Sequence, residues 1–312
     1  MAAADLPAEP FTGEVRWPPR LRPGDRLAAV APAGPPDRGR AEAGRALLES
    51  WGLEVDLVPG AFAGHRSGFL AADDDRRVRD LEAAFTDDRV AGIVCLRGGY
   101  GSQRLLELLD FDAITAHPKA FVGFSDVTAL HVALRQRAGL VTFHGPNLAG
   151  DLRRIGELGG SALRAALFEG TFEPLQGEPL SPGRVRAPLV GGNLALLSTL
   201  CGTPDALRAD GCVLLLEDVG EAPYRLDRAL THLRRAGTLA NVAGLAFGGF
   251  DDCVGPPGGA TARDVAAEHA ARLDRPAVYG LPLGHGPGQR TVAHGGEVDL
   301  DGDAGVLVPT GR

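Results

Sequence analysis

Short apolar runs and helical apolar patterns alternate along the first half of the chain. The run RLAAVAP (26–32) ends at proline and predicts a strand, and apolar residues at helical spacing over 41–52, closed by Gly52, predict a helix. The same order recurs, with predicted strands at 53–58, 90–96 and 119–124 and predicted helices at 76–87, 102–110 and 127–137. Strands that alternate with helices imply a parallel sheet. The first half therefore predicts an α/β domain.

The pattern changes near the middle of the chain. Over 158–188 the periodicity gives way to Gly, Pro and Glu, as in TFEPLQGEPLSPGR, which predicts a linker. Beyond it, strands are predicted at 212–220 and 242–250, helices at 224–238 and 260–273, and short strands in a Gly- and His-rich tail. We therefore expect a disordered lead-in over 1–20, an N-terminal α/β domain over 21–157, this linker, and a mixed α+β domain over 189–312.

The composition narrows the class of protein. Its 44% hydrophobic and 23% charged residues, with a mean hydropathy of -0.02, are typical of a soluble globular protein. The net charge of -8 and pI near 5.5 argue against a nucleic-acid partner, because phosphate binding relies on clustered Lys and Arg. The N-terminal segment contains Asp5 and Glu9 and has neither a basic start nor an apolar run, so it predicts no secretory signal. We expect a cytoplasmic protein without a membrane segment.

An apolar strand leads directly to Ser125 at the start of a helix. In KAFVGFSDVTALHVAL the strand ends at a tight turn, which places a hydroxyl above the sheet. The N–H of Asp126 lies near it, and the unpaired N–H groups and dipole of a helix N-terminus favour developing negative charge. This suits a nucleophile in acyl transfer. An ordinary helix N-cap is the other interpretation of Ser125, and the segment lacks the second glycine of a G-x-S-x-G elbow.

The glycine-rich segment RGGYGSQR (97–104) follows a predicted strand and precedes a predicted helix. An open parallel sheet places ligand loops at such positions. Three interpretations stay open: a phosphate cradle, an oxyanion loop in which Gly98 or Gly99 gives an N–H group, or a tight turn without a ligand. The Walker pattern fails because no Gly-Lys-Ser/Thr follows.

Two segments of the second half carry candidate acid–base groups. Glu217 lies where the apolar strand of LLLEDVGEAPYRLDR ends. One interpretation is a carboxylate that contacts a catalytic side chain rather than the substrate. The other is that Glu217, Asp218 and Glu221 are solvated acids ahead of the next helix, where negative charge stabilises the N-terminus. His285 stands between glycines in YGLPLGHGPGQRTVAHGG, which leaves its imidazole accessible.

The histidines do not form a metal-binding motif. His285 and His294 are a loose pair without further ligands at helix or hairpin spacing, so we expect no metal. His294 is interpreted as structural. His144, at the end of a predicted strand, either lines the cleft or satisfies a backbone group.

Five motifs, taken in order, resemble the LD-carboxypeptidase (muramoyltetrapeptide carboxypeptidase) family of serine peptidases, peptidase family S66. The resemblance runs from about Arg22 to Thr310. The motifs are Arg-Gly-Gly-Tyr-Gly at 97–101, Gly-Phe-Ser-Asp at 123–126, Gly-Gly-Asn at 191–193, Leu-Glu-Asp-Val-Gly-Glu-x-Pro-Tyr-Arg-x-Asp-Arg at 216–228 and Gly-His-Gly at 284–286.

The resemblance implies an N-terminal three-layer α/β domain with a parallel sheet, flavodoxin- or amidotransferase-like, and a C-terminal mixed α+β domain. Ser125 is then the nucleophile, His285 the general base and Glu217 the carboxylate that orients it, with oxyanion N–H groups from Asp126 and from Gly98 or Gly99. The implied activity is that of a serine carboxypeptidase, a hydrolase that releases the terminal D-alanine of cytoplasmic muropeptide tetrapeptides in peptidoglycan recycling. The resemblance also suggests a homodimer, and no cofactor is expected.

Candidate substrate contacts lie in or beside the same motifs. An arginine is expected to hold the terminal carboxylate of the substrate through a bidentate contact. The candidates for that contact are Arg97, Arg225 and Arg290, and further candidates for contact with substrate are Tyr100, Asn193 and Tyr224.

Two other functions stay open. An immunity-type peptidase of the same superfamily, cleaving aminoacyl-nucleotide conjugates such as processed microcin C, needs an aromatic surface for the nucleobase, and Trp17 and Trp51 offer little of it. A non-catalytic sensor of muropeptides or nucleotides would use RGGYG as its ligand loop and Ser125 as a helix cap.

Overall fold

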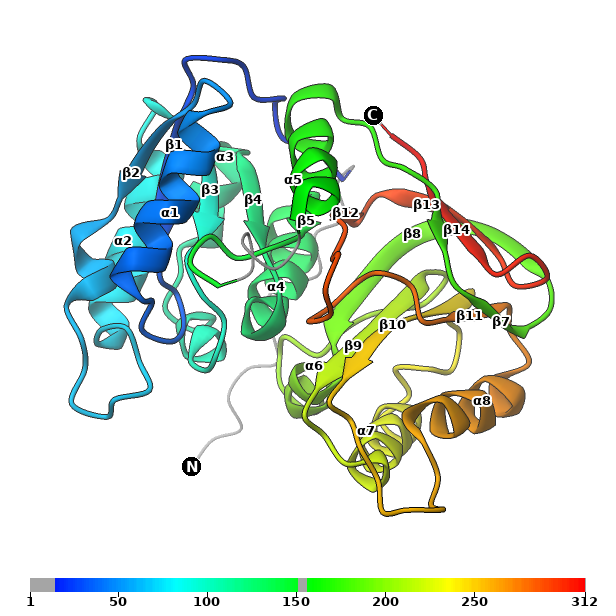
Figure 1. Ribbon diagram of the computed structural model, residues 1–312. Helices are drawn as coiled ribbons and strands as arrows, with labels where there is room; N and C mark the ends of the chain where they lie inside the picture. The colour runs from blue at the N-terminus through cyan, green and yellow to red at the C-terminus, as the bar shows by residue number, and fades with distance from the viewer. Residues whose placement is uncertain (1–14, 151–155, 312) are drawn as a thin grey trace.

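The computed structural model describes residues 15–150 and 156–311, arranged around two β-sheets (Figure 1). The first is six-stranded, in the order β12-β5-β4-β3-β1-β2. Neighbours from β2 to β5 pair in parallel, whereas β12 is antiparallel to β5. The strands are β1 (Arg26–Val30), β2 (Glu54–Leu57), β3 (Val90–Cys95), β4 (Ala120–Gly123), β5 (Thr142–His144) and β12 (Val292–His294).

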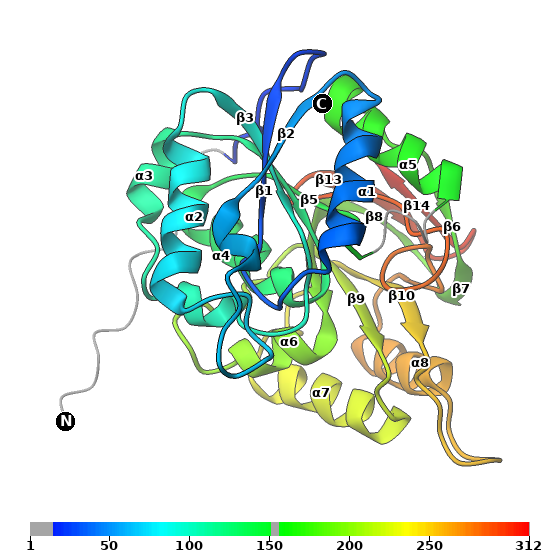
Figure 2. The same cartoon turned by 60° about the vertical axis from the view of Figure 1, so that its left-hand side comes forward.

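Helices cover both faces of this sheet, which gives three layers (Figure 2). Apolar side chains of α1 (Arg38–Glu49) and α5 (Gly156–Arg164) pack on one face, against alternate residues such as Leu27 and Ala29 of β1. The other residues of the same strand, such as Ala28 and Val30, face α2 (Asp74–Thr86), α3 (Phe111–Ala116) and α4 (Thr128–Ala138). Burial on both faces explains why these strands are continuously apolar in sequence.

The second sheet is eight-stranded and mixed, in the order β6-β14-β13-β8-β9-β10-β11-β7. Its centre, β8-β9-β10-β11, is parallel, and its flanking strands pair antiparallel. The strands are β6 (Leu175–Gln176), β7 (Glu178–Ser181), β8 (Arg184–Asn193), β9 (Val213–Val219), β10 (Gly244–Asp251), β11 (Ala277–Tyr279), β13 (Glu297–Asp301) and β14 (Val306–Pro309).

The second sheet buries different residues on its two faces. Leu214 and Leu216 of β9 pack with the helices α6 (Leu194–Leu200), α7 (Pro223–Arg235) and α8 (Ala262–Leu273), whereas Val213 and Leu215 point into a separate core inside the curved sheet. Because side chains alternate along a strand, Glu217 falls on the face of Leu215. The fold class expected from the sequence, an α/β domain with a mostly parallel sheet followed by a mixed domain, is confirmed.

The two halves of the molecule share a strand. The chain leaves the second sheet after β11, and β12 then pairs with β5 of the first sheet, with Val292 opposite His144 (Figure 1). The chain returns to the second sheet at β13. Nothing in the Gly- and His-rich tail of the sequence indicated this crossing.

Three segments differ from the sequence-based expectation. Residues 158–188, expected as a linker, contain most of α5, the strands β6 and β7 and the start of β8. Of the expected lead-in, residues 1–14 lie outside the described residues, and Arg16 forms a β-bridge with Leu140. The predicted helix at 102–110 is wrong: a short 3₁₀ turn over Ser102–Leu105 is followed by α3, which begins after the cap Asp110.

The start of this segment is bound to another loop. The carboxylate of Asp126 accepts the N–H of Ser102, and its backbone carbonyl accepts the hydroxyl of Ser102. The Asp110 carboxylate instead accepts the N–H of Ala113 and starts α3. Within residues 15–150 and 156–311, no helix is long and apolar enough to cross a membrane.

Candidate functional site

Ser125 occupies a strained turn between β4 and α4. Phe124 is still extended, and Ser125 then has a φ of 66°, the left-handed region that is unfavourable for a side chain other than glycine. A short 3₁₀ turn over Ser125–Val127 leads into α4. The sharp change of direction raises the serine hydroxyl above the carboxyl end of the sheet, as the sequence pattern predicted.

The hydroxyl of Ser125 begins a chain of two hydrogen bonds across the two halves of the molecule. Its Oγ lies 3.0 Å from Nε2 of His285, and Nδ1 of the same ring lies 2.8 Å from Oε2 of Glu217. Glu217 is completely buried at the carboxyl end of β9. A buried carboxylate that accepts Nδ1–H leaves Nε2 as the acceptor for the serine proton.

Glycines make room for this arrangement. Gly284 has a φ of 118°, and a Cβ there would lie 2.8 Å from Oε2 of Glu217. A Cβ on Gly248 would come within 3.2 Å of the Cβ of Glu217. The glycine before His285 is therefore required for the close approach of the loop to the carboxylate.

Strand β12 brings His285 over the first domain. His285 precedes β12 by a few residues, and β12 pairs with β5, which is next to β4. The imidazole packs against Phe124, with 4.7 Å between ring centroids. The strand pairing and this ring contact together fix the imidazole beside the serine.

The glycine-rich segment forms one wall of the site. Gly98 is buried, and a Cβ on it would lie 3.1 Å from Oγ of Ser125 and 3.4 Å from the N of Asp126. Its carbonyl accepts the N–H of Gly34 at 3.0 Å. The segment therefore lies directly against the turn at Ser125, and its three interpretations stay predictions.

The exposed candidates for substrate contact lie around this wall and near the end of β9. Arg97 is exposed and donates to the carbonyl of Pro35 at 2.8 Å. Tyr100 is 48% exposed and packs edge-on against Phe69. Both side chains are exposed and lie within two residues of Gly98, which contacts Ser125, so both are accessible to a bound molecule.

Tyr224 and Arg225 lie at the start of α7, beyond the end of β9. Tyr224 is 63% exposed, and Nε of Arg225 donates to its hydroxyl at 3.1 Å. Arg225 also contacts Glu221 at 3.4 Å. The third arginine, Arg290, donates to Glu173 and to the carbonyl of Gly288. Glu173 therefore competes with any substrate carboxylate for Arg290.

Asn193 is buried, and its polar atoms bind the protein itself. Its Oδ1 accepts the N–H of Leu196 and caps α6, and its Nδ2 donates to Asp218 at 3.1 Å. The pKa of Asp218 is raised to about 6: burial and the charge of Glu217 raise it, and the N–H groups that this carboxylate accepts act in the opposite direction. The sequence did not single out this buried pair of side chains.

Three histidines are buried where β12 joins the first sheet. His131 of α4 contacts Thr142 and the carbonyl of Gly123, and its ring lies 5.5 Å from that of His294. His144 is fully buried beside Phe124. Its complete burial contradicts the expectation that it lines the cleft.

Burial lowers the pKa of these imidazoles, to about 4 for His131 and about 3 for His144, and for His294 well below 6.5. They are therefore neutral at neutral pH. Across the described residues, no group of three or more His, Cys, Asp or Glu side chains is arranged to hold a metal ion.

Comparison with known proteins identifies the family. Residues 27–145 match the LD-carboxypeptidase N-terminal domain and residues 186–300 match the LD-carboxypeptidase C-terminal domain. A putative carboxypeptidase of Streptomyces coelicolor is 43% identical over 94% of this chain and 96% of its own length. A murein tetrapeptide carboxypeptidase of Pseudomonas aeruginosa is 33% identical over 89% of this chain and 94% of its own length.

Solved structures share the fold. The muramoyltetrapeptide carboxypeptidase from Oxalobacter formigenes superposes with a TM-score of 0.81 at 29% identity, over 91% of this chain and 97% of that one. A microcin C7 self-immunity protein superposes with a TM-score of 0.84 at 20% identity, over 95% and 98% of the two chains, which shows the fold alone. A two-domain carboxypeptidase is thus the class of protein that the fold and the sequence matches define. The chain belongs to the LD-carboxypeptidase family, S66.

Proposed function

We propose that this protein is a serine LD-carboxypeptidase that removes the terminal D-alanine from muropeptide tetrapeptides in the cytoplasm, as a step of peptidoglycan recycling. The observation that carries the proposal is the hydrogen-bonded chain from Ser125 through His285 to Glu217. The names of the family relatives, murein peptide and murein tetrapeptide carboxypeptidases, support the substrate class.

The proposed mechanism follows from the three side chains. Nε2 of His285 accepts the proton of Ser125 as Oγ attacks the carbonyl carbon of the amide that joins the L-centre of the diamino acid to D-alanine. Glu217 accepts the Nδ1–H and stabilises the imidazolium, which then protonates the leaving amine. Water, activated by the same imidazole, hydrolyses the acyl-enzyme and restores the serine.

The N–H groups around Ser125 are the proposed oxyanion donors. That of Asp126 lies in the first turn of a helical segment, where no intrahelical acceptor exists. That of Gly98 or Gly99 lies on the glycine wall, and among the described residues no carbonyl accepts either N–H. A donor of this kind typically contributes about a hundredfold or more to the rate.

Arg97 is the proposed anchor for the terminal carboxylate of the substrate. It is exposed, its known protein contact is a single carbonyl, and it directly precedes the glycine that contacts Ser125. Arg225 and Arg290 each already contact a glutamate. Replacing each arginine by Lys is expected to raise KM most for Arg97. Equal, unchanged KM values for all three variants would remove the arginine anchor from the proposal.

Mass spectrometry of reaction products tests the proposed function. Wild-type protein and Ser125→Ala are incubated with a muramoyl tetrapeptide that ends in D-alanine. We expect loss of one D-alanine with the wild type and a rate at least about a thousandfold lower with the variant. If the folded wild type leaves the tetrapeptide intact, an aminoacyl-nucleotide conjugate becomes the next substrate to test.

A fluorophosphonate distinguishes an enzyme from a sensor. The reagent labels an activated serine and therefore is expected to label the wild type at Ser125 and to leave Ser125→Ala unlabelled. A wild type that stays unlabelled would contradict the catalytic assignment of Ser125 and favour a binding protein.

A further inference from the structure

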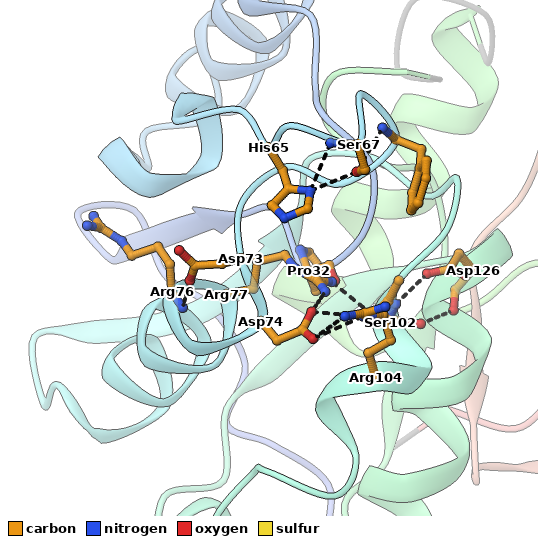
Figure 3. Close-up of polar contacts among 12 residues, drawn as sticks. Pro32, His65, Ser67, Asp73, Asp74, Arg76, Arg77, Ser102, Arg104 and Asp126 are labelled. Atoms are coloured by element: carbon orange, nitrogen blue, oxygen red, sulfur yellow. Dashed lines mark hydrogen bonds and ion pairs between the residues drawn. The ribbon is translucent and has the colours of Figure 1, made fainter.

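A buried polar network lies behind the glycine-rich segment 97–104, the glycine wall of the site (Figure 3). Its centre is Asp126, the residue after the candidate nucleophile, which is 1% exposed. Its Oδ2 accepts the N–H of Ser102 at 2.8 Å, and the hydroxyl of Ser102 donates to its backbone carbonyl. The end of the glycine-rich segment is therefore bound to Asp126 through both side chain and backbone.

Arg77 of α2 holds the same segment from the other side. Its side chain is 1% exposed, and its NH1 donates to the carbonyl of Gly101 at 2.8 Å and to that of Pro32 (Figure 3). The guanidinium is itself held by Asp74, which also binds Arg104 at 2.9 and 3.0 Å. Arg77 thus fixes the turn after β1 and the glycine-rich segment to one another.

These contacts set where the glycines stand. Gly101, with a φ of 129°, is bound through its carbonyl, and Ser102 through its N–H, so the segment cannot shift towards or away from the turn at Ser125 without breaking both hydrogen bonds. At its other end, the carbonyl of Gly98 is bound by Gly34. The positions of Gly98 and Gly99 relative to Ser125 depend on these ties.

Charge gives Arg77 a second role. A buried carboxylate beside the position where negative charge develops on the substrate opposes that charge. Burial raises the pKa of Asp126, while the N–H and hydroxyl of Ser102 and the positive charge of Arg77 act in the opposite direction. The positive charge of Arg77 therefore offsets the negative charge of the Asp126 carboxylate, which the loop needs as the acceptor for the N–H of Ser102.

We propose that the Asp126 side chain and Arg77 form a positioning pair that sets the distance between the oxyanion donors on the glycine wall and the N–H that follows Ser125. The proposal rests on the proposed function, since it concerns the same reaction. Neither side chain contacts the substrate in this scheme. Both act through the segment 98–102, so they are positioning residues.

Steady-state kinetics of Asp126 variants on the muramoyl tetrapeptide test the pair. Asp126→Ala removes the acceptor for Ser102, and we expect kcat to fall by about a hundredfold with KM changed by less than about threefold, because the lost contacts matter only as the oxyanion forms. Asp126→Asn keeps an oxygen that accepts the same N–H, so we expect a fall of only about tenfold. Arg77→Met should resemble Asp126→Ala, and Arg77→Lys should lie between it and the wild type.

Asp205→Asn is the matched control. Asp205 is also a buried carboxylate near an arginine, 3.5 Å from Arg137, and burial likewise raises its pKa. Arg137 is in the last turn of α4, about 15 Å along the helix from the turn at Ser125. Asp205→Asn is expected to lose stability while its kcat stays within about twofold of the wild-type value. The proposal is overturned if both Asp126 variants retain the wild-type kcat. It is also overturned if their kcat falls by no more than that of Asp205→Asn.

The rate of fluorophosphonate labelling separates this proposal from the substrate assignment. If the wild type labels at Ser125 and leaves the tetrapeptide intact, the substrate assignment fails, and the positioning pair is supported only if Asp126→Ala labels at least about tenfold more slowly than Asp205→Asn. Equal labelling rates overturn it. A wild type that does not label at all overturns both proposals.

Discussion

Gly98 shows how much a missing side chain matters at the candidate site. A Cβ at this position would lie 3.0 Å from the Cβ and 3.1 Å from the Oγ of Ser125. Gly98→Ala is therefore expected to lower kcat by about tenfold to a hundredfold, because the methyl group displaces the hydroxyl from His285. The measurement is D-alanine release from the tetrapeptide by the purified variant.

Gly160→Ala provides the control for that substitution. Gly160 lies in α5, and a Cβ on it meets nothing within 4 Å. Alanine there is expected to leave kcat unchanged and to raise stability by about 0.5–1 kcal/mol, since glycine disfavours a helix interior. Full activity of Gly98→Ala would show that the turn at Ser125 moves more freely than its contacts indicate.

Sequence reasoning at the residue scale located the three side chains of the hydrogen-bonded chain but not their support. Ser125, Glu217 and His285 each follow a recognisable strand end or glycine turn, so a local pattern pointed to them. Arg77 lies in the first turn of an amphipathic helix, and no local pattern distinguishes it from the arginines around it. Its role depends on carbonyls that only the folded chain brings within reach.

At the scale of elements, α4 and β8 are joined through Thr128. This fully buried residue in the first turn of α4 accepts the N–H of Asn193 through its Oγ1 at 3.0 Å. Thr128→Val keeps the size of the side chain and leaves that N–H without its acceptor. We expect the free energy of unfolding to fall by about 1–3 kcal/mol.

Urea unfolding of the wild type, Thr128→Val and Thr128→Ser measures this contact. The serine variant keeps the hydroxyl and loses one methyl group, which costs about 1 kcal/mol. We expect Thr128→Val to have a lower free energy of unfolding than Thr128→Ser, because only the serine variant keeps the acceptor for the N–H of Asn193. We also expect a lower kcat for Thr128→Val, because Asn193 and the adjacent end of β9 shift. Wild-type stability of Thr128→Val would show that the hydrogen bond contributes nothing measurable.

The elements with regular apolar periodicity were predictable, and those that depend on distant partners were not. Strands β1 to β4 and helices α1, α2 and α4 follow the predicted order because each strand is a short run bounded by turn residues and each helix has apolar residues at helical spacing. The segment 102–110 has helical spacing as well, yet only a short 3₁₀ turn forms at its start, and the next helix begins after the cap Asp110. Strands β6 and β7 are too short to show an alternation of their own.

At the scale of the whole molecule, three buried histidines that are neutral at neutral pH, His131, His144 and His294, make the stability depend on pH. In the unfolded chain these imidazoles gain protons below about pH 6.5. In the folded protein His131 stays neutral to about pH 4 and His144 to about pH 3. Because the unfolded state binds more protons in this interval, the stability present at neutral pH is lost as the pH falls below 6.5, by about 2 kcal/mol per histidine at pH 5.

His294→Leu tests this prediction. The pKa of His294 is well below 6.5, because burial, the neighbouring histidines and Arg135 all disfavour its charged form. The variant is expected to show a smaller loss of unfolding free energy between pH 7.5 and pH 5 than the wild type. The pH dependence of the variant is compared with that of the wild type, because the raised pKa values of Asp126 and Asp218 make stability change with pH in the opposite direction in both proteins. His65→Gln, on a surface turn, is the control, and an unchanged pH dependence in His294→Leu would contradict the prediction.

The position of β12 also sets an order of events during synthesis. A chain growing from its N-terminus completes α1 to α4 and β1 to β5 while residues 285–294 are still to be made. Until then β5 has an open edge and Ser125 has no imidazole beside it. Under the proposed mechanism, Ser125 consequently gains its general base only when nearly the whole sequence has been made.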